Sequence, residues 1–158
     1  MFRELRRKNR QLPQEACVEL LMTEKRGVLS LIGDGGYPYG IPMNHWYDPA
    51  DGHLYFHGGK TGHRVDAADR DDRVSYCVHD QGTAEEGTWA LTVRSVVVFG
   101  RLRRVEDRDR VIHISRQLSY RFTKDEAYID REIERSAAGT LCWELIPEHM
   151  TGKRVVES

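Results

Sequence analysis

The segment ALTVRSVVVFGRLRRV, residues 90–105, is the longest run of strand-forming residues in the chain. Four consecutive apolar residues near its centre, Val96 to Phe99, give both faces of the predicted strand apolar side chains. A strand of this kind is covered on both sides. The segment therefore predicts that the core covers one face of this strand, and that a helix or a second subunit covers the other.

The pattern on either side of this strand predicts a mainly β protein. Glycine-rich turns at 33–36 and 48–52 join three short apolar segments, which predicts an antiparallel meander. Few connections between strands are long enough for a helical crossover, so we expect a closed or partly closed antiparallel β-barrel with peripheral helices. The other expected strands are 27–32, 37–47, 53–57, 73–79 and 140–146, and the expected helices are 13–26, 62–71, 111–118 and 129–137.

A length of 158 residues predicts one domain, 1–158, with a basic arm at 1–12 and a C-terminal tail at 147–158. The 24 Lys and Arg residues nearly balance the 25 Asp and Glu residues, so the net charge of −1 gives no reason to expect a nucleic-acid partner. Residues 3–10, RELRRKNR, are locally basic. They favour a solvated or frayed terminus over a dedicated phosphate-binding arm.

Three widely spaced cysteines, Cys17, Cys77 and Cys142, form no CxxC pair and lie within predicted helices or strands. They are interpreted as small buried hydrophobic residues of a protein in a reducing compartment. No apolar run approaches the roughly 18 residues of a membrane span, and the first residues are too charged for a signal peptide. We therefore expect a cytoplasmic protein without a membrane partner.

The stretch FHGGKTGHR, residues 56–64, contains the end of a nucleotide-binding P-loop. The full motif needs a glycine five positions before Gly59, and Leu54 stands there. Lys60, His63 and Arg64 lie at the start of a predicted helix, where unpaired amides and the helix dipole favour an anion. The stretch is thus a candidate phosphate site, and a solvated basic surface is the alternative.

The stretch PYGIPMN, residues 38–44, places two prolines in an otherwise strand-like segment. Because proline cannot donate to a strand ladder, this strand lies at an edge. Gly40 between the prolines is typical of a close approach by a flat ligand or of a bulged edge without one. If the strands pair in meander order, Pro42 to His45 lie near His57 to Lys60, so that a ring and a phosphate could bind side by side.

His57 ends a predicted strand and could serve as an acid or base, as a metal ligand or as a plain surface residue. The chain has no HExxH pair, and His57 with His63 is a loose match to a metal site, so we expect no metal. The chain has neither a GxSxG elbow nor a cysteine in a glycine-rich turn, so nothing in it suggests a nucleophilic triad.

Four blocks resemble a known family: GVLSLIGDGGYPYGIPMNHWYD, GHLYFHGGKTGHRVDAADRDDRVSYCV, VRSVVVFGRLRRV and HMTGKR. In this order they are similar to the nitroimidazole-resistance (Nim-type) branch of the pyridoxamine 5'-phosphate oxidase-like flavoproteins. The resemblance extends from about Gly27 to Arg154. It implies an FMN-binding split β-barrel that forms a homodimer with cofactor at the interface, which would supply the second cover for Val96 to Phe99.

The resemblance also implies roles for individual residues. Lys60, His63 and Arg64 would hold the FMN phosphate, the backbone of Pro42, Met43 and Asn44 would meet the isoalloxazine, and His57 would stand beside the cofactor as the catalytic candidate. Arg94, Ser95 and Lys153 lie in the matched blocks and are further candidates for binding the cofactor. The sequence departs from this branch at His45, where an aromatic residue is common.

These implications lead to one main functional hypothesis. The chain is expected to be an FMN-dependent oxidoreductase that takes electrons from NAD(P)H and delivers them to a small electrophile such as a nitroimidazole or another nitroaromatic. The alternative is a flavin or haem carrier or sensor of the same fold without turnover. A nucleic-acid-binding protein that uses residues 3–10 is the third hypothesis.

Overall fold

The structure is a computed structural model that describes residues 1–157. Four α-helices surround one antiparallel sheet, as expected from the sequence. The helices are α1 (Gln14–Thr23), α2 (His63–Arg70), α3 (Arg108–Tyr120) and α4 (Glu126–Ser136). The strands are β1 (Arg26–Ile32), β2 (Pro38–Asn44), β3 (Trp46–Asp48), β4 (His53–Gly59), β5 (Arg73–His79), β6 (Thr83–Ala84), β7 (Leu91–Val105) and β8 (Thr140–Glu157).

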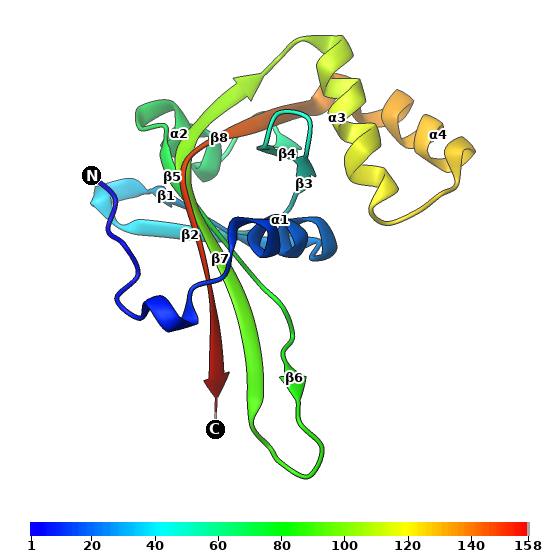
Figure 1. Ribbon diagram of the computed structural model, residues 1–158. Helices are drawn as coiled ribbons and strands as arrows, with labels where there is room; N and C mark the ends of the chain where they lie inside the picture. Colours follow the sequence, from blue (N-terminus) through cyan, green and yellow to red (C-terminus); the bar gives the residue numbers. More distant parts are fainter. Residues whose placement is uncertain (158) are drawn as a thin grey trace.

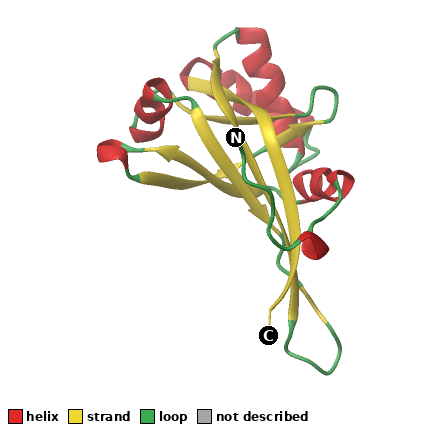
Figure 2. Cartoon of the chain, turned by 60° about the vertical axis from the view of Figure 1, so that its left-hand side comes forward, coloured by secondary structure: helices red, strands yellow, loops and turns green. Residues whose placement is uncertain are grey.

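The sheet curls into a half-open barrel (Figure 1, Figure 2). Its strand order is β2-β1-β5-β7-β8-β4-β3, and the short β6 pairs with β7 outside this path. The two edge strands, β2 and β3, are separated only by His45, so one continuous length of chain joins the two edges of the sheet. This arrangement confirms the predicted mainly β barrel with peripheral helices.

Pairing at the two edges differs in part from the predicted meander. The hairpin of β1 and β2 is confirmed, with Val28 opposite Pro42. The predicted strand 37–47 is broken at His45, because His45 turns into the interior and its amide donates to the Lys25 carbonyl instead of a ladder. As a result β4 pairs with β3 and β8 and not with β2.

The predicted tail at 147–158 was wrong, because β8 continues to Glu157 along β7. The ladder shifts register at Phe99 and Gly100, where Pro147 lies opposite Gly100 and Glu148 is the additional residue. A β-bulge accommodates a proline that would break a regular ladder. The two strands and β6 project beyond the barrel as a ribbon (Figure 1).

The core lies between the concave face of the sheet and α1. Cys17, Leu20 and Leu21 of α1 are fully buried, and the Cys17 sulfur lies directly over Gly152 of β8. A side chain at position 152 would collide with this sulfur, so Gly152 allows the helix to approach the strand closely. The prediction that the cysteines are buried holds for Cys17 and Cys142, whereas Cys77 is half-buried on the outer face.

The basic arm contacts the sheet through Phe2 and Leu12, while most of its other side chains are exposed, in agreement with the expected solvated terminus. The Leu12 amide donates to the Gly152 carbonyl at 2.8 Å, and the Phe2 ring stacks on Phe99 and His149 with centroids 5.4 and 5.1 Å away. Phe2 and Leu12 therefore supply apolar contacts to the sheet, and the charge pattern of the arm did not predict these contacts.

The outer face of the sheet is mostly uncovered in the single chain. Val96 and Val98 are fully buried, but Val97 is half-buried and Phe99 is 38% exposed. The predicted burial of both faces is therefore met on one face only, apart from the contact with Phe2. One row of register partners crosses five strands on the outer face, namely Pro42, Val28, Cys77, Val97 and Thr151.

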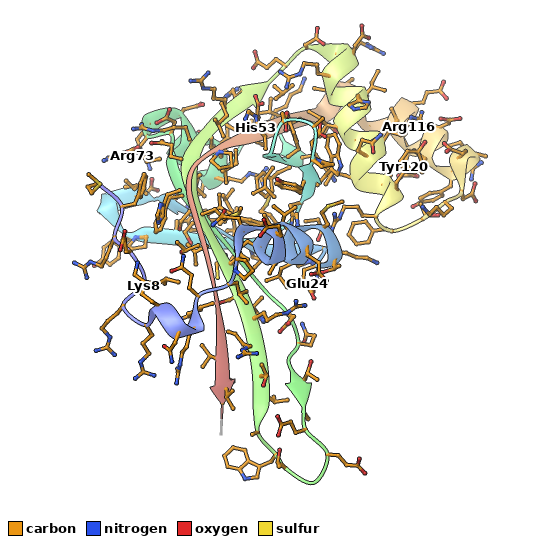
Figure 3. The ribbon with its side chains drawn as sticks, viewed as in Figure 1. Lys8, Glu24, His53, Arg73, Arg116 and Tyr120 are labelled. Carbon is orange, nitrogen blue, oxygen red and sulfur yellow. The ribbon has the colours of Figure 1, made fainter. Side chains whose placement is uncertain are left out.

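Helices α3 and α4 form a hairpin beside the first half of β8 (Figure 1). Arg116 on α3 binds Glu126 and Asp130 of α4, and Tyr120 donates to Glu126 at 2.7 Å (Figure 3). These bonds link the two helices at the protein surface. Among residues 1–157, no helix is both long and apolar enough to cross a membrane.

Candidate functional site

Arg64 provides the most informative charge in the molecule. Its guanidinium lies against Gly58, where any side chain would collide with Nη2. Nη1 lies 3.3 Å from the Met43 sulfur, and the buried Nε has no hydrogen-bond partner. Within residues 1–157 no carboxylate pairs with this guanidinium. Burial lowers the pKa of Arg64, and a half-buried cation without a counter-ion favours binding of an external anion.

The N-terminus of α2 presents a second feature that suits an anion. Its cap residue is Gly62, with φ of 125°, and no side chain caps the helix there. The space above Gly59 and Gly62 is open, because a β-carbon at either position would meet nothing within 4 Å. Free amides at the positive end of a helix, beside the Arg64 guanidinium, form a suitable phosphate cradle.

A shallow hollow of about 340 Å³ lies beside this cradle. It is lined by Arg26, Pro42, Met43, Asn44 and His57. The four residues predicted from PYGIPMN and from the end of the next strand therefore do come together, although β2 and β4 are not paired. They meet because the chain between β2 and β3 crosses from one edge of the sheet to the other.

His57 is exposed at the mouth of the hollow, and its flanks are enclosed by protein. This enclosure lowers the pKa of the imidazole, and the positive charge of Arg64 lowers it further. His57 is therefore neutral at pH 7. A neutral imidazole offers one N–H donor and one lone pair, so it is better suited to accept a proton or donate a hydrogen bond than to act as a strong acid.

Lys60 and His63 do not converge on Arg64 in this structure. Lys60 points to a separate hollow beside α3. The His63 ring stacks on Tyr39 with centroids 4.0 Å apart, and its Nε2 accepts a hydrogen bond from the Asp34 amide. His63 thus fastens the turn after β1 to the start of α2, while Arg64 alone reaches the space behind Gly58.

Ser95 and Lys153 are register partners on the outer face, far along the sheet from His57. Lys153 lies in a basic hollow of about 330 Å³ together with Arg6, Arg7 and Arg10 of the arm. Arg94 is engaged by Asp80, with 3.0 Å between Nε and Oδ2. A single chain does not bring these candidates to the hollow at Met43.

His45 is the one fully buried polar residue in the described chain, so it does not face the hollow. Its Nε2 donates to the Leu21 carbonyl at 2.6 Å, which leaves Nδ1 to accept from the Tyr76 hydroxyl at 2.8 Å. The same hydroxyl lies 2.8 Å from the Met43 carbonyl. One hydroxyl proton therefore serves two acceptors directly behind the backbone of the candidate site.

The burial of His45 predicts a pH-dependent stability. Burial lowers its pKa from 6.5 to about 4, and the charge of Arg121 acts in the same direction. Below pH 6.5 the unfolded chain gains a proton at this position that the folded chain does not. The free energy of unfolding should therefore fall by up to about 3 kcal/mol between pH 6.5 and pH 4 through this group. Urea titrations across this range measure the effect.

The variant His45→Phe supplies the control for this pH dependence. It removes the titrating group, so its stability should decrease less steeply than that of the wild type between pH 6.5 and pH 4. His57 remains in both proteins and contributes equally to both slopes. Parallel slopes for the two proteins would show that His45 is not the group responsible.

A cluster of Asp51, His53 and Glu144 lies at the other end of β4. His53, which is labelled in Figure 3, has its Nδ1 atom 2.7 Å from Glu144 Oε1. The Tyr55 hydroxyl donates to Asp51 at 2.5 Å. Asp51, His53 and Glu144 could hold a metal ion, since one ligand atom from each lies within 4.8 Å of the others. Hydrogen bonds within the cluster already satisfy these atoms.

Sequence reasoning missed two residues of the site. Arg26 lines the hollow and donates to the Asn44 side chain at 2.8 Å, and Tyr76 supports the Met43 carbonyl from behind. Neither belongs to a recognisable motif. An arginine before a glycine and a tyrosine on an alternating strand look like ordinary surface and core residues.

In the described part of the chain, the half-open antiparallel barrel carries an arginine without a carboxylate partner behind a glycine-rich strand end. The chain belongs to the family described as pyridoxamine 5'-phosphate oxidase, which it matches over residues 13–154. No curated protein matches it.

Solved structures with low sequence identity share the fold. A candidate 5-nitroimidazole antibiotic resistance protein from Bacteroides thetaiotaomicron is 18% identical with a TM-score of 0.78, covering 92% of this chain and 87% of that one. A conserved hypothetical protein from Mycobacterium tuberculosis is 18% identical with a TM-score of 0.79, covering 95% and 90%. An FAD- and haem-binding protein from Mycobacterium smegmatis is 20% identical with a TM-score of 0.71, covering 91% and 72%.

Proposed function

We propose that the chain is a flavin-dependent oxidoreductase of the Nim type. The observation that carries this proposal is the Arg64 guanidinium, which is half-buried behind Gly58, lies beside the uncapped start of α2 and has no carboxylate partner in residues 1–157. This arrangement suits the phosphate that FMN carries next to its riboflavin part. The hollow at Pro42, Met43, Asn44 and His57 next to it suits the flat ring system.

A bound flavin would supply the two-electron redox chemistry. The chain's own residues would hold and orient it. Arg64 and the α2 amides would fix the phosphate, and the Met43 segment, supported from behind by Tyr76 and His45, would fix the ring. His57 is neutral at pH 7 and would donate a hydrogen bond to the cofactor or substrate, or accept a proton from it.

The sequence resemblance to the Nim branch and the Bacteroides neighbour support a nitroimidazole or related nitroaromatic as the electron acceptor. NAD(P)H is the proposed electron donor. The shallow, open shape of the hollow accords with a small planar substrate. A non-catalytic carrier is the second candidate, favoured by the neighbour described as binding FAD and haem.

A second copy of the chain is the proposed partner. The outer face carries exposed Val28 and Phe99, and a groove of about 560 Å³ extends from Pro42 to Phe122 across it. Exposed apolar residues in a groove that also has charged residues such as Lys25 and Arg26 at its border support a protein interface there. A dimer formed there would cover the flavin hollow at its rim and give it a second wall.

Electron transfer through the bound flavin tests the catalytic proposal. We expect anaerobic NADPH or NADH to bleach the flavin absorption of the loaded protein, and a 5-nitroimidazole to restore it. The expected stoichiometry is one flavin reduced per NAD(P)H consumed, followed in a spectrophotometer. A flavin that stays bound but is neither reduced nor reoxidised would support the carrier and contradict the oxidoreductase.

A further inference from the structure

A second hollow, of about 290 Å³, lies beside the glycine-rich strand end, and Lys60 is one of its lining residues. Most of its lining residues come from the end of β7, the start of α3, the turn after α4 and the start of β8. Its volume is close to the lower end of the roughly 300–1,000 Å³ found for small-molecule sites. The lining residues are Lys60, Arg104, Glu106, Arg108, Val111, Ala137, Ala138, Thr140 and Leu141.

The charges in this hollow are only partly neutralised. Arg104 is held by Asp69 and Glu106, but neither Lys60 nor Arg108 has an ion-pair partner in the part of the chain that is described. Arg108 lies in the first turn of α3, where the helix dipole disfavours a cation. Two free cations therefore face a floor that is apolar at Val111 and Leu141. This combination suits a phosphate attached to a flat ring.

The glycine-rich strand end connects this hollow to the phosphate cradle. Gly58 and Gly59 are register partners of Leu141 and Thr140, which line the hollow, and adjacent strands are about 4.8 Å apart. Arg64 lies against Gly58, and Lys60, which follows Gly59 in the chain, lines the second hollow. The space above Gly59 is open. A ligand with two linked phosphates can thus pass over Gly59 from one cationic site to the next.

We propose that this hollow receives the adenylate half of FAD, so that the chain binds the dinucleotide in preference to FMN. The inference rests on the proposed flavin site. Arg64 holds the phosphate next to riboflavin, Lys60 and Arg108 hold the phosphate of the adenylate, and the adenine ring lies on Val111, Ala137 and Leu141. The three free cations then neutralise a dianionic pyrophosphate that FMN lacks.

Dissociation constants for FMN and FAD, measured by quenching of flavin fluorescence, test this assignment. We expect FAD to bind the wild type at least about tenfold more tightly than FMN. The variants Arg108→Ala and Ala138→Trp should remove that advantage and leave the FMN constant unchanged. Both positions are exposed, so folding should not suffer, and Arg131→Ala on the exposed face of α4 is the matched control. Excess AMP should raise the dissociation constant of FAD until it is close to the dissociation constant of FMN.

Equal affinities of the wild type for FMN and FAD would overturn the assignment. A parallel loss of both affinities in Arg108→Ala would also overturn it, because that result assigns Arg108 to the flavin phosphate. If neither FMN nor FAD binds, the result is a distinct one that overturns the proposed function and this inference together. An AMP effect on FMN binding of the same size as its effect on FAD would place the nucleotide at the cradle beside Arg64.

Discussion

Replacing Arg64 with alanine should weaken flavin binding by about tenfold to a hundredfold. A charge-assisted hydrogen bond to a phosphate contributes about 1.5 to 3 kcal/mol, and Arg64 is the guanidinium that reaches the cradle behind Gly58. The variant should keep its stability or gain slightly, because the removed cation is half-buried without a counter-ion. Flavin titration and urea unfolding of the same preparation measure both effects.

Arg70→Ala is the matched control for Arg64→Ala. Arg70 lies in the last turn of the same helix and pairs with Asp34 at 2.9 Å on the surface. Its loss should leave flavin affinity unchanged. A wild-type dissociation constant in Arg64→Ala, or the same loss in both variants, would show that the cradle behind Gly58 does not hold the phosphate.

Introducing a charge at Val28 should dissociate the proposed dimer. Val28 is 44% exposed on the outer face, between Pro42 of the edge strand and Cys77. An arginine fits there in the single chain, but an unpaired charge buried in an interface costs several kcal/mol. Val28→Arg should therefore weaken association by about a hundredfold or more. Flavin affinity should decrease with it, since the second wall of the hollow is lost.

Sedimentation velocity over a concentration series reports the association state of Val28→Arg. Tyr128→Arg provides the control, since Tyr128 is 48% exposed on α4 and lies away from the outer face. A dimer that survives Val28→Arg with unchanged affinity would exclude the outer face as the interface. A wild-type protein that is monomeric at all concentrations would reject the dimer itself.

The fold could be predicted from the sequence where apolar periodicity and turn residues agree. The hairpin around Gly35 and Gly36 and the long strand through Val96 follow from such patterns. The continuation of β8 through Pro147 could not be predicted, because a bulge that tolerates proline depends on the partner strand. The same limit applies to the arm, whose docking depends on Phe2 and Leu12 among many charges.

The sequence predicted that the segment through Met43 and the end of β4 lie near each other, but it did not predict how the nearby side chains are arranged. The glycines before α2 and the segment through Met43 mark the site, because strands and helix ends position them. Sequence spacing could not separate Lys60, in the loop before α2, from His63 and Arg64 in its first turn, although the three side chains point in different directions. It also could not show that His45, next to the site residue Asn44, faces the core.

The absorption spectrum of the purified protein, recorded after incubation with FMN or FAD and removal of free flavin, tests the central claim most directly. The account predicts a yellow protein whose flavin bands elute with the chain at one flavin per chain. The yellow colour should be lost from Arg64→Ala under the same washing. A protein that is colourless as purified, and stays colourless after exposure to either flavin, would contradict the account.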